Sequence, residues 1–218
     1  VPVYVVVGGQ KGDEGKGKET DFLMHIDPKI TWVMATVGTH NAGKGVNTTN
    51  LHGNDVKVSL HLCPATLVDK NIHNYIGQNT KANLFKLEQE VLNATKATGR
   101  DQLGENYHLT VDLNTNLVLP NNRAEDIVGK INSQGSTVAG STSSTMYVGD
   151  KKAPVLEDVL YNPSNFIKKV NYQLAEFADR LARDEELQDL GIKTVKDFGQ
   201  ALKNKELIAK NSRLRALA

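Results

Sequence analysis

The chain has 218 residues, and its 26 lysines and arginines against 25 aspartates and glutamates leave a formal net charge of +1 at pH 7. A chain this close to neutral lacks the strong positive field with which dedicated nucleic-acid binders hold phosphates. Hydrophobic residues make up 39% of the sequence, which favours a folded globular chain over a disordered or fibrous one. No apolar run approaches the roughly 20 residues of a membrane-spanning helix. We therefore expect neither a nucleic acid nor a membrane as a partner.

Cysteine usage indicates the compartment. Cys63 is the only cysteine, so the chain cannot form an internal disulfide. A chain of this length buries enough surface to fold without one. We therefore expect a reducing, cytoplasmic location. The sequence begins at Val1 rather than at a methionine and ends in a basic, helical stretch, which is compatible with a longer natural polypeptide.

The first predicted element is a strand. Val3–Val7 is a short run rich in β-branched residues, closed by Gly8 and Gly9, and such a run is typical of a fully buried strand of an α/β sheet. After a glycine-rich turn, apolar residues recur at helical spacing over 18–26 and stop at Asp27 and Pro28. The order is therefore strand, glycine-rich loop, helix.

Further strands and two helices follow. A second strand is predicted over 30–37, and 46–62 predicts a hairpin, because 52–55 (HGND) is turn chemistry. The remaining elements of this part are predicted strands over 74–77, 107–111 and 116–119, a helix over 83–97 with an apolar stripe of Leu84, Leu87, Val91 and Leu92, and a helix over 123–131.

The pattern changes near residue 133. Residues 133–150 are rich in Gly, Ser and Thr with little periodicity, which indicates a mobile linker or a functional loop. Beyond Ala153 the chain is helical in character, with an amphipathic face over 166–181 and another over 195–217. We expect an α/β fold with a P-loop-like core, a mainly parallel central sheet flanked by helices, and a helical C-terminal extension. Residues 1–153 would form the nucleotide-binding core and 154–218 the extension.

The glycine-rich loop predicts a phosphate site. Its residues stand between a strand and a helix, where backbone N–H groups and a helix dipole converge on an anion. They are Gly12, Asp13, Glu14, Gly15, Lys16, Gly17 and Lys18. The spacing fits a P-loop, but Glu19 stands where an ordinary P-loop has the Ser or Thr that binds magnesium. We therefore expect phosphate binding without an ordinary P-loop NTPase; a plain connecting turn is the alternative.

Several motifs in register resemble one family. Residues 9–18 (GQKGDEGKGK) closely resemble the N-terminal loop of adenylosuccinate synthetases, GxQWGDEGKGK. In the same order, 41–44 (NAGK) resembles the family's NAGH, 60–64 (LHLCP) its LHLLP, and 76–77 (IG) part of its VIGNG. A weaker match lies at 139–142 (AGST), which resembles IGTT, the start of the family's loop that contacts the nucleoside monophosphate. Beyond that point the resemblance fades.

The resemblance implies a ligase of purine biosynthesis that joins IMP and L-aspartate with GTP and Mg²⁺, in the cytoplasm and as a homodimer. It implies that Asp13 takes the proton from N1 of the purine and binds magnesium. The purine O6 then attacks the γ-phosphoryl group of GTP, and the amine of aspartate displaces phosphate from C6. A carboxylate is ionised at pH 7 and suits both roles, while glycine amides and Lys16 stabilise the transferring phosphoryl group.

The same resemblance assigns the site residue by residue. Catalysis is assigned to Asp13 and Lys44, and the metal ion to Asp13 and Gly43. The nucleotides and their phosphates are assigned to Gly12, Asp13, Glu14, Gly15, Lys16, Gly17, Lys18, Asn41, Ala42, Gly43 and Thr142.

Lys44 departs from the family pattern most sharply, because the family's proton donor at this place is the histidine of NAGH. A lysine with a pKa near 10.4 donates a proton poorly at neutral pH. We interpret Lys44 as a fixed positive charge for the O6 oxyanion and the γ-phosphate. His40 is either a substitute acid or a surface-loop residue, and Lys11 replaces the tryptophan of the family loop.

The later segments of the family, which bind aspartate and recognise guanine, have no equivalent after Ala153. Lys151 and Lys152 are the only basic candidates for the family's dimer-partner arginine, and solvated surface charges are the alternative. Two other functions therefore stand beside adenylosuccinate synthesis. One is a phage-type relative that acts on dGMP, and the other is a purine-nucleotide-binding chain without turnover. Glu19 counts against a P-loop switch protein.

Overall fold

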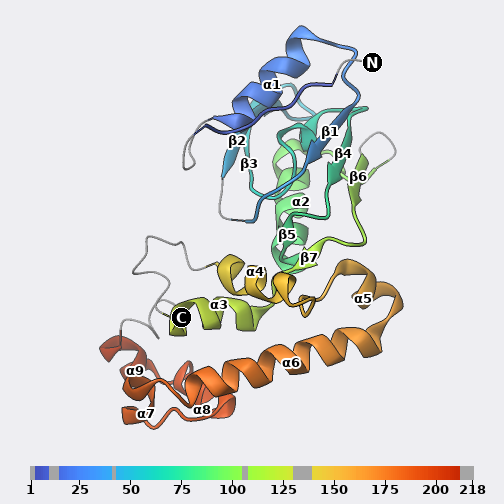
Figure 1. The fold of residues 1–218 in the computed structure, drawn as a ribbon. Coiled ribbons are helices and arrows are strands. Elements are labelled where there is room, and N and C mark those ends of the chain that lie inside the picture. Colours follow the sequence, from blue (N-terminus) through green and yellow to red (C-terminus); the bar gives the residue numbers. More distant parts are fainter. Residues whose placement is uncertain (1–2, 10–14, 41–42, 105–107, 130–138, 212–218) are drawn as a thin grey trace. The chain divides into compact units, whose positions relative to one another are not determined.

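The computed structural model describes residues 3–9, 15–40, 43–104, 108–129 and 139–211 (Figure 1). The chain divides into two compact units that meet in the sequence between Thr115 and Asn116. The assignment of residues 1–153 to one nucleotide-binding domain stays a prediction.

The first unit contains a parallel sheet, a hairpin and two long helices. Its elements are α1 (Lys16–Ile26), β1 (Trp32–Ala35), β2 (Lys44–Thr49), β3 (Asp55–Leu60), the short 3₁₀ helix η1 (Ala65–Val68), β4 (His73–Ile76), β5 (Lys81–Ala82), α2 (Leu84–Thr98) and β6 (His108–Val111).

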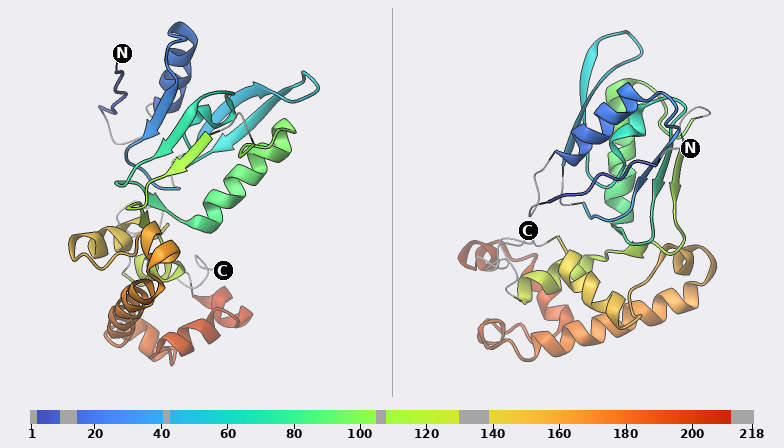
Figure 2. Two further views of the ribbon diagram at one scale, coloured as in Figure 1. Left: turned by 90° about the vertical axis from the view of Figure 1, so that its right-hand side faces the viewer. Right: turned by 45° about the horizontal axis from the view of Figure 1, so that its top comes forward.

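The sheet has the order β1-β4-β6, and both pairings are parallel. The first residues of the three strands, Trp32, His73 and His108, lie in register. Their rings stack, with centroids 4.5 Å apart in the first pair and 4.3 Å in the second. Helices α1 and α2 lie on opposite sides of the strands (Figure 2). The expected α/β fold with a parallel sheet flanked by helices is thus confirmed.

The predicted first strand, Val3–Val7, is wrong. No residue of this run forms a strand, and Val3, Val5 and Val7 are 85%, 75% and 77% exposed. Among the described strands, none pairs with the outer edge of β1. The run has the composition of a buried strand, but a strand also requires a neighbouring strand to pair with. Val3–Val7 does not pair with the edge of β1.

The predicted hairpin is confirmed. Strands β2 and β3 pair antiparallel from Lys44 opposite Leu60 to Thr49 opposite Asp55. The side-chain oxygen of Asn50 accepts hydrogen bonds from the backbone of His52 at 2.9 Å and of Asn54 at 3.0 Å. This turn chemistry fixes the register of the two strands.

Helix α2 begins and ends as its sequence predicts. The Asn83 side chain accepts a hydrogen bond from the amide of Lys86 at 3.1 Å, and Gly99 closes the helix with φ 69°. Leu87 and Val91 are buried as expected. The prediction was wrong for Leu92, which is 51% exposed.

The second unit is almost entirely helical. Its elements are β7 (Asn116–Leu117), α3 (Pro120–Val128), α4 (Ser141–Gly149), α5 (Leu156–Tyr161), α6 (Pro163–Leu181), α7 (Glu185–Asp189), α8 (Val195–Ala201) and α9 (Lys205–Lys210). The helical C-terminal extension is therefore confirmed. Across the described ranges, no helix combines the length and the apolarity that crossing a membrane requires.

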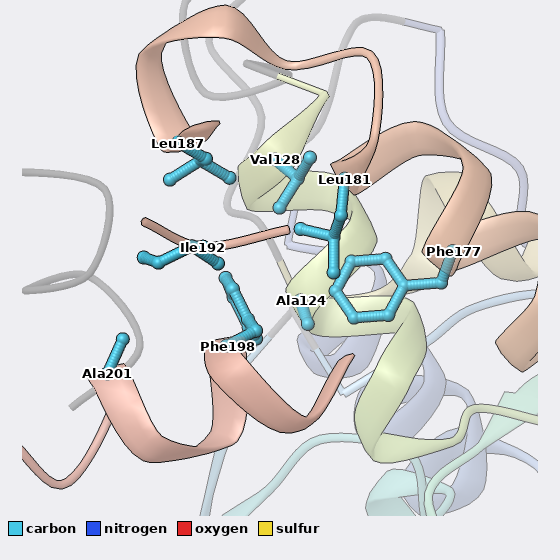
Figure 3. Close-up of a cluster of buried hydrophobic side chains, with 8 residues drawn as sticks. All are labelled: Ala124, Val128, Phe177, Leu181, Leu187, Ile192, Phe198 and Ala201. Atoms are coloured by element: carbon cyan, nitrogen blue, oxygen red, sulfur yellow. The ribbon is translucent and has the colours of Figure 1, made fainter. Parts of the chain in front are cut away.

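The core of the second unit joins α3 and α6 to the C-terminal helices. Phe177 and Leu181 of α6 point toward α3 in Figure 3, and the Phe177 ring meets Phe198 edge-on at 5.4 Å between centroids. The cluster comprises Ala124, Val128, Phe177, Leu181, Leu187, Ile192, Phe198 and Ala201. Of the amphipathic face predicted over 166–181, Phe177 and Leu181 lie in this core.

The segment predicted as a linker or functional loop contains a helix. Residues 130–138 lie outside the described residues, but Ser141–Gly149 forms α4. Gly140 precedes it with φ 84°, and a Cβ there would lie 2.9 Å from the backbone nitrogen of Arg123, so only glycine fits. The buried Asp126 carboxylate accepts from the amides of Gly140 and Ser143, both at 2.8 Å. This carboxylate stabilises a helix start that has no apolar periodicity.

Candidate functional site

The described half of the glycine-rich loop forms the start of α1. Gly15 precedes the helix with φ 72°, in the left-handed region that favours glycine. The amides of Lys18 and Glu19 donate to the Gly15 carbonyl at 2.8 and 3.1 Å, which closes the first turn. Gly12, Asp13 and Glu14 lie outside the described residues, so their predicted roles stay predictions. The helix start does provide the dipole that the phosphate prediction requires.

Lys44, the first residue of β2, packs against this helix start. A Cβ added at Gly17 would lie 3.3 Å from Cγ of Lys44. The Lys44 ammonium donates hydrogen bonds to the backbone carbonyls of His61 and of Cys63, the latter at 2.8 Å. Burial lowers the pKa of Lys44, and the nearby Glu90 carboxylate opposes that shift. Lys44 is thus a half-buried cation beside the predicted phosphate loop.

Glu90 of α2 holds the other side of the segment His61–Cys63. Its carboxylate is 5% exposed and accepts hydrogen bonds from three consecutive backbone amides. The distances are 2.6 Å to His61, 3.2 Å to Leu62 and 2.9 Å to Cys63. Cys63 itself is buried, and burial raises the pKa of its thiol far above the ordinary value. This thiol therefore stays protonated and is no nucleophile.

His40 is a neutral imidazole at pH 7. Burial, followed by the positive charge of Lys86, lowers the pKa of His40 to about 4. The backbone amide of Asn83 donates to its Nδ1 at 3.4 Å, which favours the tautomer with the proton on Nε2. An imidazolium at this position would therefore be rare under physiological conditions, and this weighs against His40 as a substitute proton donor.

Gly43 lies beside the same segment. A Cβ there would come within 3.6 Å of Nε2 of His61. Asn41 and Ala42 lie outside the described residues, so the NAGK motif is described only at its second half. The structure thus brings Gly43 and Lys44 together with the loop that follows β3.

A cavity of about 590 Å³ opens next to these groups. Lys16, Gly17 and Lys44 contribute to its wall, and most of the remaining wall is apolar. The apolar and other lining residues include Val3, Val5, Val6, Thr20, Leu23, Met24, Trp32, Val33, Met34, Pro64 and Ala65. Two residues predicted for the phosphate site and Lys44, predicted as catalytic, therefore share one cavity.

The remaining predicted residues belong to the second unit. Thr142 lies exposed in the first turn of α4. The Lys152 ammonium lies 5.0 Å from the centroid of the Tyr172 ring, a cation–π contact within the unit. Lys151 is exposed. The role of Thr142 in binding a nucleotide stays a prediction.

Magnesium was assigned to Asp13 and Gly43. In the part of the chain that is described, no three His, Cys, Asp or Glu side chains gather to hold a metal ion. A carboxylate with a backbone carbonyl is nevertheless a donor set of hard oxygens, and Mg²⁺ commonly binds through one or two protein oxygens plus substrate phosphates and water. The assigned pair fits such a nucleotide-bound ion, and does not fit a cage built by the protein alone.

The sequence motifs did not reveal Glu90. It lies 27 to 29 positions from its partners, so no local spacing connects them. One signal was present, because Glu90 falls between Leu87 and Val91 on the buried face of α2, where a charged residue is unexpected.

Comparison with known proteins points to one family. The family profile described as adenylosuccinate synthetase matches residues 5–214. The adenylosuccinate synthetase of Renibacterium salmoninarum is 37% identical over 128 residues, which cover 59% of this chain and 27% of that protein. The enzyme of an Arthrobacter species is 30% identical over 203 residues, which cover 91% of this chain and 44% of that protein.

A solved structure shows the same fold. The fully ligated adenylosuccinate synthetase of Plasmodium falciparum superposes with a TM-score of 0.60 at 20% identity, covering 91% of this chain and 47% of its own. The chain spans less than half the length of these relatives. With the profile match over nearly its whole length, the chain belongs to the adenylosuccinate synthetase family.

Proposed function

We propose that this chain binds purine nucleotides through the phosphate loop at the start of α1, with Lys44 as a fixed cation of the site. The nucleotides are IMP and GTP, and the reaction that this site serves is the joining of IMP and L-aspartate to give adenylosuccinate. A homodimer in the cytoplasm, as the family resemblance implies, is part of the same proposal.

One observation carries the proposal. The first turn of α1 and the Lys44 side chain meet at Gly17, beside a cavity that Lys16 also lines. A helix N-terminus with two lysines attracts an anion, and the absence of a side chain at Gly17 lets the cation approach the helix closely. A cavity of about 590 Å³ lies within the range of ordinary small-molecule sites.

The residues would divide the work as follows. Asp13 accepts the purine N1 proton, which makes O6 the nucleophile toward the γ-phosphoryl group of GTP. Lys16 and the amides of the loop hold phosphate oxygens, and Lys44 adds positive charge where negative charge develops. Mg²⁺, held by Asp13 and Gly43, would neutralise phosphate charge. Aspartate recognition is not assigned to any residue of this chain.

Nucleotide titration of matched variants tests the proposal. Lys16→Ala removes a charge-assisted contact, so the affinity for GTP should fall roughly ten- to a hundredfold. Lys70→Ala removes an exposed lysine of the same unit that does not line the cavity, and it should bind GTP like the parent. Equal affinities of the parent and Lys16→Ala, measured by calorimetry, would refute the assignment of the loop.

Nucleotide binding without turnover is the second candidate function. Two hydrogen bonds of the Lys44 ammonium go to backbone carbonyls, and this position has no histidine to deliver a proton. An assay with IMP, GTP and aspartate separates the two functions. Binding of GTP without adenylosuccinate formation favours the non-catalytic function, and sustained product formation by these 218 residues favours the ligase.

A further inference from the structure

One peptide group connects the half-buried Lys44 ammonium with the buried Glu90 carboxylate. The carbonyl of His61 accepts a hydrogen bond from the Lys44 ammonium, and the amide of Leu62, in the same peptide group, donates to the Glu90 carboxylate at 3.2 Å. The neighbouring amides of His61 and Cys63 also donate to Glu90, and the carbonyl of Cys63 also accepts from Lys44. The segment His61–Cys63 thus presents its amides to an anion and its carbonyls to a cation.

The two charges are of opposite sign but share no direct contact within the salt-bridge distance among the described pairs. Peptide dipoles aligned between them stabilise both, because each carbonyl points at the positive end and each amide at the negative end. A buried ion without such partners would be strongly destabilising. The loop therefore lies between the two charges with dipoles that favour both.

We infer that Glu90 is a positioning residue of the candidate site, which keeps Lys44 charged and directed at the segment His61–Cys63 through the peptide group between His61 and Leu62. This inference deepens the proposed function, because Lys44 belongs to the proposed phosphate site. Its test requires no nucleotide, so failure of nucleotide binding and failure of this inference can be told apart.

Other titratable groups near Lys44 do not replace Glu90. The Cys63 thiol stays protonated because burial raises its pKa, and His40 is neutral because burial lowers its pKa to about 4. The His61 imidazole also faces this region and carries no negative charge. Glu90 is therefore the anion that sustains the charge on Lys44 among these groups.

The test is the pH dependence of stability in Glu90→Gln. At pH 7 the variant should increase the unfolding equilibrium constant roughly ten- to a hundredfold, because Lys44 loses its counter-charge. Loss of Glu90 lowers the folded-state pKa of Lys44 further below its unfolded value of about 10.4. A base with a lowered pKa is destabilising while charged, so the stability of the variant should recover as the pH rises toward 10.

Trp32, the only tryptophan, lies in the same unit and reports its unfolding by fluorescence. Glu88→Gln, on the exposed face of the same helix, is the matched control and should leave the free energy of unfolding unchanged at any pH.

A double variant tests the coupling. In a Lys44→Met background, the effect of Glu90→Gln on stability should no longer depend on pH between 7 and 10. If Glu90 were purely structural, Glu90→Gln would increase the unfolding equilibrium constant by the same factor at every pH. In the double variant this factor would simply multiply the factor caused by Lys44→Met. That result would overturn the inference.

Glu90→Gln could fail to fold, and Lys44→Met then decides the question. This variant leaves the Glu90 carboxylate without its cation, so it should raise the unfolding equilibrium constant at pH 7, and Lys44→Arg, which keeps the positive charge, should recover most of that loss. A Lys44→Arg variant no more stable than Lys44→Met would overturn the inference equally.

Discussion

Lys44 shows how one residue alters the chemistry of a site. A lysine ammonium has three N–H donors, and here two of them meet the carbonyls of His61 and Cys63. Among the described residues the third N–H has no hydrogen-bond partner, so in the proposed site the residue can hold the loop and add positive charge to a phosphate. A histidine in the same place would exchange protons near pH 7, whereas an ammonium keeps its proton. The role proposed for Lys44 is therefore charge stabilisation and not proton transfer.

Gly17 is predicted to be required for the approach of Lys44. Gly17→Ala in α1 and Gly199→Ala in α8 both raise helix propensity, which by itself stabilises a protein by about 0.5–1 kcal/mol. At Gly199 a Cβ meets nothing within 4 Å, but at Gly17 it lies 3.3 Å from Cγ of Lys44. We expect Gly199→Ala to raise the free energy of unfolding and Gly17→Ala to raise it less or to lower it. If urea denaturation gave equal increases in the free energy of unfolding for the two substitutions, Lys44 would not be in close contact with the start of α1.

The sequence predicted the local geometry at the start of α1. Gly15 and the lysines of the loop were assigned to phosphate because a phosphate loop consists of consecutive residues; the helix start is confirmed, and the binding role stays a prediction. Glu90 could not be predicted in its role, because its partners lie in a loop almost thirty residues away. Only the folded chain shows that a carboxylate on the buried face of α2 meets three amides.

The distinction between local and long-range interactions also holds for whole helices and strands. The β2–β3 hairpin and α2 were predicted because the turn residues 52–55 and the apolar stripe of α2 are local signals, and the Asn50 turn and the Asn83 cap of the structure also act within a few residues. The prediction of a strand over Val3–Val7 was wrong, since hydrophobicity indicates a preference for burial but does not determine which strand the run would pair with. Helix α4 was missed because Asp126, fourteen to seventeen positions earlier, stabilises its start.

The contact between α1 and η1 is predicted to be pH-sensitive. Burial raises the pKa of Asp69, at the end of η1, to about 6, and the charge of Asp21 on α1 raises it further, against a smaller lowering by His25. An acid with a raised pKa is most favourable when protonated, so its contribution to stability is present at about pH 4 and is lost as the pH rises through about 6.

Asp69→Asn should therefore stabilise the chain at pH 8 by about 1 kcal/mol, after allowance for partial exposure, and the gain should vanish near pH 4. Asp55→Asn, at an exposed position of β3, is the control and should have little effect. Thermal unfolding at both pH values measures the difference. An Asp69→Asn variant that gains nothing at pH 8 would contradict the assigned environment of this carboxyl group.

At the scale of the whole molecule, the order of elements predicted the architecture. Most strands lie in the first part and, among the described elements, helices alone follow Leu117, so an α/β core and a helical extension followed from the sequence. Each compact unit has buried side chains of its own, and the predicted phosphate loop belongs to the first. Because the chain spans less than half of its relatives, synthesis of adenylosuccinate is a separate question from nucleotide binding.

The central claim is that the site binds nucleotide phosphate with Lys44 as a permanent cation. The most direct test is the affinity for GTP of the parent and of Lys44→His, measured by calorimetry from pH 6 to pH 8.5. The parent should bind almost equally across this range. Lys44→His should approach the parent at pH 6 and fall roughly tenfold or more behind it by pH 8.5, because an imidazolium discharges above about pH 7. A variant that binds GTP as well as the parent at every pH, or that gains adenylosuccinate synthesis at pH 8.5, would contradict the account.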